Sequence, residues 1–348
     1  GETGRVRVRS EALELEAGSL DVAFLEDGSG ASGGDRIERI DAEGGVVALR
    51  PDGSARLDAR TLTVDMRQDS DAARPGRIEA EGEVRAFDAA RVLWASALEV
   101  VLRSPGEADR TSEDADLSDA VASPVDDDVE SAVARGGVVA GLADGTWVIA
   151  DAFAAHPEDG TLDLEGEDVG ILRDAALLDG LQGLTLVERD GIVEASTPGP
   201  GRLQAANSPL ADAWSAPTPE QVRTWSWPPP PTRPAMPDAL AVAAVWEGGL
   251  QNIESRKAST PGAEVATLDI SDRVRARTVE VGRPAEKPSG RREDRLAADR
   301  VRVGFGRAER REDAAEDAPP RLEIASMDLE GAASLERRRW SSDTDAVT

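Results

Sequence analysis

Apolar and polar residues alternate with a period of two along much of the chain, and turn residues separate the alternating runs. In residues 37–66, apolar positions lead through the glycine pair Gly44-Gly45 to a Pro-Asp-Gly turn at 51–53, and a second alternating run follows at 57–64. Alternation of this period places one set of side chains on the buried face of a β-strand and the other set in water. The pattern therefore predicts two strands joined as a hairpin.

The same pattern recurs along the chain. Residues 77–102 repeat it around Gly82, and the stretch that begins at 131 repeats it around Gly136-Gly137. Degenerate copies are found at 5–15, 294–305 and 321–335. Glycine inside a strand marks a bulge or a bend, so its repetition predicts repeated bending. The expected fold is all-β: an elongated twisted β jelly roll, or a stacked β-sandwich, built from repeated short antiparallel strands.

Small aliphatic residues dominate the inward positions of these copies, which favours a space between two sheets that can hold an apolar guest. Packing against other core residues is the alternative for each of these positions. The candidates for a lipid-binding groove are Val46, Leu57, Leu62, Val64, Ile78, Val84, Val92, Trp94, Leu98, Val100, Val138, Val148, Leu162 and Leu164.

Two segments interrupt the repeats and suggest three regions. Residues 1–206 form the repeat region, in which the acidic, Ser/Pro-bearing segment 104–128 is a loop. Residues 207–238 are rich in Pro and Trp and form a loop or linker, and 239–348 continue the repeats in degenerate form. The Pro/Trp segment is either a polyproline ligand for an aromatic groove or a loop whose Trp side chains cover the open end of the sheets; the second interpretation is favoured.

The hairpin copies resemble a known family. The unit A-x-G-x-V-x-φ, turn, L-x-A-x-x-L-x-V stands here as AEGGVVAL/RLDARTLTV and AEGEVRAF/VLWASALEV. It resembles the OstA-like domain of periplasmic lipopolysaccharide-transport proteins, the LptA/LptC-like β jelly roll. The resemblance implies two sheets in an open V with an apolar interior for acyl chains, a periplasmic location, and head-to-tail stacking through edge strands. It also implies other lipopolysaccharide-transport proteins as partners.

Composition narrows the function classes. The formal net charge of −28 argues against a nucleic-acid partner, because that affinity rests on positive footprints. The chain has no Cys and a single His, His156, so Cys-ligated metals, thiol nucleophiles and two-His metal sites are excluded. The Asp126–Asp128 tract lacks the ligand spacing of a calcium-binding EF-hand loop. Arg greatly outnumbers Lys, and Arg suits the phosphates of an anionic lipid.

The sequence therefore predicts a non-catalytic carrier without cofactor or metal, which binds lipopolysaccharide or another amphipathic lipid between two sheets. The chain starts at Gly1 without Met and shows no signal peptide, so an export signal or a membrane-attached segment is expected upstream. The alternative is a structural or adhesive extracellular β-repeat protein without a ligand. An enzyme is disfavoured because no convergent set of polar groups stands out.

Overall fold

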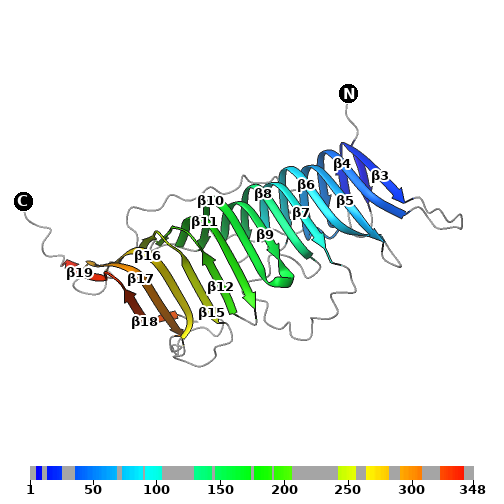
Figure 1. The fold of residues 1–348 in the computed structure, drawn as a ribbon. Coiled ribbons are helices and arrows are strands. Elements are labelled where there is room, and N and C mark those ends of the chain that lie inside the picture. The colour runs from blue at the N-terminus through cyan, green and yellow to red at the C-terminus, as the bar shows by residue number, and fades with distance from the viewer. Residues whose placement is uncertain are drawn as a thin grey trace, which may run out of the picture. The chain divides into compact units, whose positions relative to one another are not determined.

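Antiparallel β-strands make up nearly all of the structure (Figure 1). The computed structural model describes residues 5–9, 14–25, 36–68, 73–88, 91–103, 129–142, 146–173, 176–189, 192–205, 242–255, 264–281, 291–307 and 322–340. The expected all-β class is confirmed. Within these ranges, no helix is long and apolar enough to cross a membrane. The acidic segment 104–128 and the Pro/Trp segment 207–238 fall outside the described residues.

The chain divides into two compact units, and β10 (Thr161–Arg173) crosses the division at Leu164/Glu165. Unit 1 contains β1 (Val6–Arg9), β2 (Glu14–Ala17), β3 (Ser19–Leu25), β4 (Arg36–Leu49), β5 (Ala55–Gln68), β6 (Ala73–Asp88), β7 (Arg91–Leu102), β8 (Val129–Leu142) and β9 (Trp147–His156). Unit 2 contains β11 (Ala176–Arg189), β12 (Ile192–Thr197), β13 (Gly201–Ala205), β14 (Val242–Trp246), β15 (Leu250–Ser255), β16 (Glu264–Val281), β17 (Arg291–Arg307), β18 (Leu322–Glu330) and β19 (Ser334–Trp340).

In unit 1, each strand from β3 to β9 pairs with the next one along the chain. The hairpins β4–β5, β6–β7 and β8–β9 coincide with the three sequence copies. The turn of the first hairpin is the expected one: Gly53 N donates to Arg50 O at 2.8 Å, and Gly53 has a φ of 77°. Asp52 Oδ1 accepts a hydrogen bond from Ser54 N at 2.9 Å, which closes the turn further.

Every one of these hairpins is bent at its glycine. The pairing register shifts between Glu43 and Val46 in β4, and the corresponding shifts follow in β6 and β8. Gly44, Gly82 and Gly136 occupy these bends with φ values of 85°, 78° and 83°. Since glycine adopts this left-handed conformation without steric cost, each long strand becomes two segments joined at an angle.

Charged residues lie on the outer face of the bent strands. Arg39 Nε lies 2.9 Å from Asp41 Oδ2 on β4, and Arg77 Nη2 of β6 lies 2.7 Å from both Glu79 Oε1 and Glu99 Oε1. These side chains are all partly exposed, so the pairs add little stability. The ion pairs do show that these Asp, Glu and Arg positions of the repeat lie on its solvent-facing side.

Unit 2 is organised around two long strands, β16 and β17, which pair with each other. The first part of β16 pairs with β15 and its second part with β14, while the first part of β17 pairs with β19 and its second part with β18. Nearby, the buried Trp246 ring fills the space beside Gly201, where an added Cβ would lie 2.4 Å from Trp246 Cζ2. The degenerate copies at 294–305 and 321–335 therefore fall on genuine strands.

Candidate functional site

Four rows of apolar side chains cross unit 1 from strand to strand, on the inner side of the bends. Near row 1 is Ala42, Leu62, Ala80, Leu98, Ala134 and Phe153. Near row 2 is Val46, Ala59, Val84, Ala95, Val138 and Ala150. Far row 1 is Ile40, Val64, Ile78, Val100, Ala132 and Ala155. Far row 2 is Leu15, Ala48, Leu57, Ala86, Leu93, Ala140 and Val148.

Large and small side chains alternate from strand to strand in three of the rows. Near row 1 alternates Ala with Leu or Phe, near row 2 alternates Val with Ala, and far row 2 alternates Ala with Leu or Val. The alternation has a period of two strands, one hairpin. Facing large and small residues interdigitate, which lets a core of aliphatic side chains close without aromatic bulk.

The rows nearest the bends are the best packed. Ten of the twelve near-row residues are buried, whereas seven of the thirteen far-row residues are only half-buried. In the first two hairpins, residues from both sides of the bends join in one cluster; Ala42, Val46 and Val84 are among its members. The two segments of each strand therefore face each other across this cluster, and coverage decreases away from the bends.

Most of the groove candidates lie on these rows. Ten of the fourteen are row members: Val46, Leu57, Leu62, Val64, Ile78, Val84, Leu98, Val100, Val138 and Val148. Leu162 packs against the cluster of Val129, Ala132 and Ala155 that continues far row 1. Leu164 is buried. Most candidates that the sequence pattern selects thus lie on the inner face, and their contact with a lipid stays a prediction.

Val92 and Trp94 lie on the opposite face of β7. Val92 pairs with Phe87 of β6, and the three residues form a separate cluster, in which Trp94 stacks on Trp147 with a ring-centroid distance of 6.1 Å. The bend of β7 lies after Trp94, at a register shift that changes which positions face inward. An alternation continued across the bend therefore selects the wrong face for these two residues.

A signal in the sequence would have placed this face correctly. Aligning VLWASALEV of the second copy with RLDARTLTV of the first sets Leu93 and Ala95 against Leu57 and Ala59. Leu93 and Ala95 are the row members that the structure shows. Trp94 corresponds to the charged Asp58 of the first copy, which indicates an outer position.

Polar chemistry is sparse among the described residues. They contain no group of three or more His, Asp or Glu placed to hold a metal ion. His156 ends β9 and immediately precedes the 3-10 turn Pro157–Asp159. The acidic tract Asp126–Asp128 is outside the described residues.

Comparison of the sequence with models of protein families gives no match, and comparison with curated proteins gives none either.

Proposed function

We propose that unit 1 binds the acyl chains of an amphipathic lipid between the two segments of its bent strands and acts as a non-catalytic periplasmic carrier or bridge. The observation that carries the proposal is the inner face itself, on which four apolar rows run through three hairpins without a charged side chain. Burial of one acyl methylene contributes about 0.8 kcal/mol, so such a face can hold lipid without a catalytic group.

The half-buried far rows are the part of this face that a lipid would contact. Near-row residues such as Val84 and Val138 are already covered by their neighbours, so they have little surface left for a guest. Far-row residues such as Ile78, Val100 and Leu93 retain accessible surface. Lipopolysaccharide is the ligand that the resemblance to the OstA-like family favours, and another amphipathic lipid would use the same apolar face.

Exposed apolar residues at strands with one unpaired edge support contacts with other chains. Phe24 on β3 is 50% exposed, and Leu335 on β19 is 61% exposed. β3 pairs only with β4, and β19 only with β17, among the described strands. An unpaired strand edge presents backbone donors and acceptors to a further strand. Other lipopolysaccharide-transport proteins, or a second copy of this chain placed head to tail, are the proposed partners.

A structural β-repeat protein without a ligand is the second candidate, because the near rows already pack on one another as an ordinary sandwich core does. The two functions differ in what the far rows contact. A carrier must leave the far-row surface free for lipid, and a structural protein has no such requirement.

The deciding experiment blocks the far rows. Ala86→Trp combined with Ala140→Trp adds two large rings to far row 2. The matched control, Ala152→Trp combined with Ala154→Trp, adds the same rings to the outer face of β9. All four alanines are half-buried, so the two variants differ mainly in the face that they change. Native mass spectrometry follows incubation of each protein with lipopolysaccharide and with phospholipid.

The carrier hypothesis predicts stoichiometric retention by the parent chain and the control, and at least a tenfold loss in the blocked variant. Circular dichroism checks that each variant is folded, and the single substitutions serve if the double variant is not. Absence of retention by the parent chain, or equal retention by the blocked variant, would favour the structural protein.

A further inference from the structure

A pocket of about 400 Å³ lies on unit 2, over β14, β16, β17 and β19. Three rows of cross-strand neighbours line it. The two outer rows are Ala243, Arg277, Arg295 and Glu336, and Val245, Arg275, Ala297 and Ser334. The row between them is Ala244, Ala276 and Leu296, which is apolar throughout.

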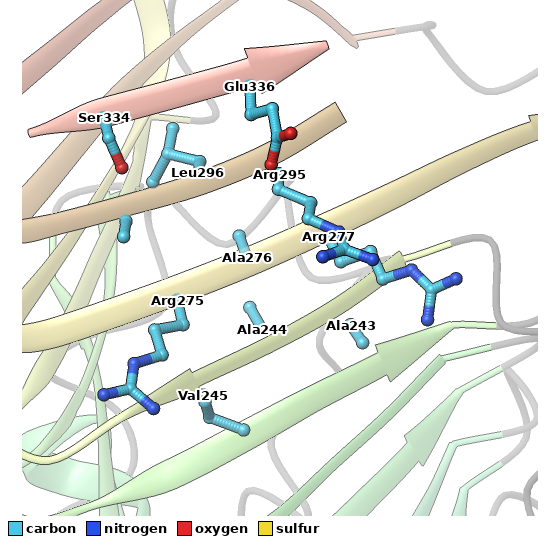
Figure 2. Close-up of a pocket in the computed structure, with 11 residues that line it drawn as sticks. Ala243, Ala244, Val245, Arg275, Ala276, Arg277, Arg295, Leu296, Ser334 and Glu336 are labelled. Carbon is cyan, nitrogen blue, oxygen red and sulfur yellow. The ribbon is translucent and has the colours of Figure 1, made fainter. Parts of the chain in front are cut away.

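Small residues make the floor and arginines make the walls. Figure 2 shows the Arg277 and Arg295 side chains close together, and the Arg275 side chain extending away from them, with Ala243, Ala244 and Val245 nearby. A short side chain at each floor position leaves the hollow between the arginine stems. The result is a shallow apolar trough with guanidinium groups along its rim.

The charges around this trough are unequal. Arg277 Nε and Arg295 Nε lie 3.0 and 2.5 Å from the same oxygen, Glu293 Oε1. The hydrogen bond from Arg295 holds the pKa of the buried Glu293 carboxyl below its ordinary value, so Glu293 stays ionised and neutralises one of these two arginines. Two guanidinium groups thus share the Glu293 carboxylate, and Glu336, the cross-strand neighbour of Arg295, also interacts electrostatically with Arg295.

Arg275 has no ion-pair partner among the described residues, and it is exposed at the pocket rim. The one carboxylate that lines the pocket, Glu336, lies 2.7 Å from Arg338 Nη2 through its Oε1 atom. Guanidinium groups bind phosphate and carboxylate oxygens in bidentate fashion. A positive rim of this kind stands out in a chain whose net charge is −28.

We propose that this pocket binds a small amphiphilic oxyanion: one phosphate or carboxylate group on a short apolar chain. The oxyanion lies against Arg275, while Arg277 and Arg295 add positive charge elsewhere on the rim, and the alkyl part lies on the alanine and valine floor. The pocket belongs to unit 2 and does not depend on lipid binding by unit 1.

Isothermal titration calorimetry of the full chain tests the site with four probes: hexyl phosphate, hexanoate, inorganic phosphate and hexylammonium. The alkyl oxyanions should bind, inorganic phosphate should bind at least tenfold more weakly because it lacks the apolar part, and hexylammonium should not bind. The tighter of hexyl phosphate and hexanoate identifies the oxyanion that the site takes.

Substitutions then locate the site. Arg275→Ala should weaken binding by about tenfold or more, as loss of a charged hydrogen bond does. Glu336→Gln should strengthen it, because it removes a negative charge from the wall. Arg302→Ala, an exposed β17 arginine that does not line the pocket, is the matched control and should change nothing.

Failure of both alkyl oxyanions to bind overturns the proposal, as does binding that Arg275→Ala and Glu336→Gln leave unchanged. Equal binding of hexylammonium overturns the charge argument and with it the proposed ligand class. None of these results depends on the lipid-retention experiment on unit 1.

Discussion

The bends in β6 and β8 of unit 1 and the bend in β16 of unit 2 place the glycine on opposite partners of a close backbone approach. In β6 and β8, the bent strand carries the glycine and the neighbouring strand carries a side chain that covers it. A Cβ on Gly82 would lie 2.7 Å from Arg60 Cβ, and a Cβ on Gly136 would lie 2.6 Å from Ser96 Cβ. Ser96 Oγ also donates a hydrogen bond to Gly136 O at 2.7 Å.

In unit 2, the bent strand β16 carries the side chain. Asp272 and Arg273 stand at the register shift with φ values of 61° and 50°. The glycine is on the neighbouring connection between β14 and β15, where a Cβ on Gly248 would lie 2.4 Å from Asp272 Oδ2 and 2.8 Å from Asp272 Cβ. Glu247 N donates to Asp272 O at 2.9 Å and holds the two backbones together.

The comparison shows that a bend has two separate requirements. Two backbones approach closely and leave room for one side chain between them, and the bent strand has residues in the left-handed region. β4 and β8 use Gly-Gly, β6 uses Gly82-Glu83 with φ values of 78° and 54°, and β16 uses Asp-Arg. Asp enters the left-handed region at a lower cost than most residues, which explains its place at the β16 bend.

The largest effect is expected from a β-branched residue at a unit 1 bend. Gly136→Val should lower the free energy of unfolding by about 3 kcal/mol, because it combines left-handed strain with a clash against Ser96. Gly137→Ala is the control: Gly137 also has a positive φ of 77°, but a Cβ there meets no atom within 4 Å. It should cost about 1 kcal/mol, the backbone strain alone. Urea denaturation measures both, and equal losses would contradict a role for the close approach.

A smaller effect on stability is expected at the unit 2 bend, when Gly248 receives a side chain and Asp272 loses its own. Gly248→Ala alone should destabilise by about 1–2 kcal/mol through its clash with Asp272. Combining it with Asp272→Gly should restore about 1 kcal/mol, since the second change empties the space. A double-mutant cycle by urea denaturation measures this coupling. Simple additivity of the two substitutions would show that the approach of the two backbones leaves room for both side chains.

The smallest effect concerns the ion pairs beside the bends, and it depends on pH. The hydrogen bond from Arg300 lowers the pKa of Asp269 in unit 2, and the hydrogen bond from Arg39 lowers the pKa of Asp41 in unit 1. A carboxyl whose folded-state pKa is lowered contributes stability above its ordinary pKa of 3.8, and this contribution is lost as the pH falls through the lowered value.

Asp269→Asn should therefore destabilise at pH 7 and lose its effect as the pH falls below about 4. Asp41→Asn should show the same trend with a smaller amplitude, because the Asp41 side chain is 41% exposed and that of Asp269 is 17% exposed. Urea denaturation of each variant and the parent chain between pH 7 and pH 3 gives these differences. A destabilisation by Asp269→Asn that is unchanged at pH 3 would rule out the ion pair as its source.

The strands and many of the inner positions can be predicted from the sequence, because each repeat contains both the apolar-polar alternation and the turn that follows it. Leu57, Leu62 and Val64 can be assigned from alternation and a turn alone, whereas Val92 and Trp94 are misplaced because the position of a bend within a strand decides the facing of every residue beyond it. The bend at Asp272 and Arg273 could not be predicted, because neither residue type by itself indicates a bend.

The arginine pocket could not be predicted for a different reason. Arg275 and Arg277 are two residues apart, but Arg295, Ser334 and Ala243 join them only through the pairing of β16 with β14 and β17, and of β17 with β19. Strand register across such long connections leaves no local trace in the residue pattern.

The alternation of large and small side chains in the inner rows determines how many strands unit 1 can gain or lose at a time while its core still fits. Loss of one strand would reverse the chain direction and set Leu62 beside Leu98 in near row 1, whereas loss of a whole hairpin would bring Leu62 against Ala134 and keep both direction and fit. We therefore expect insertion or deletion of strands in unit 1 to preserve the packing of these rows only in multiples of two. The hairpin is the smallest step that keeps both chain direction and the fit of the inner side chains.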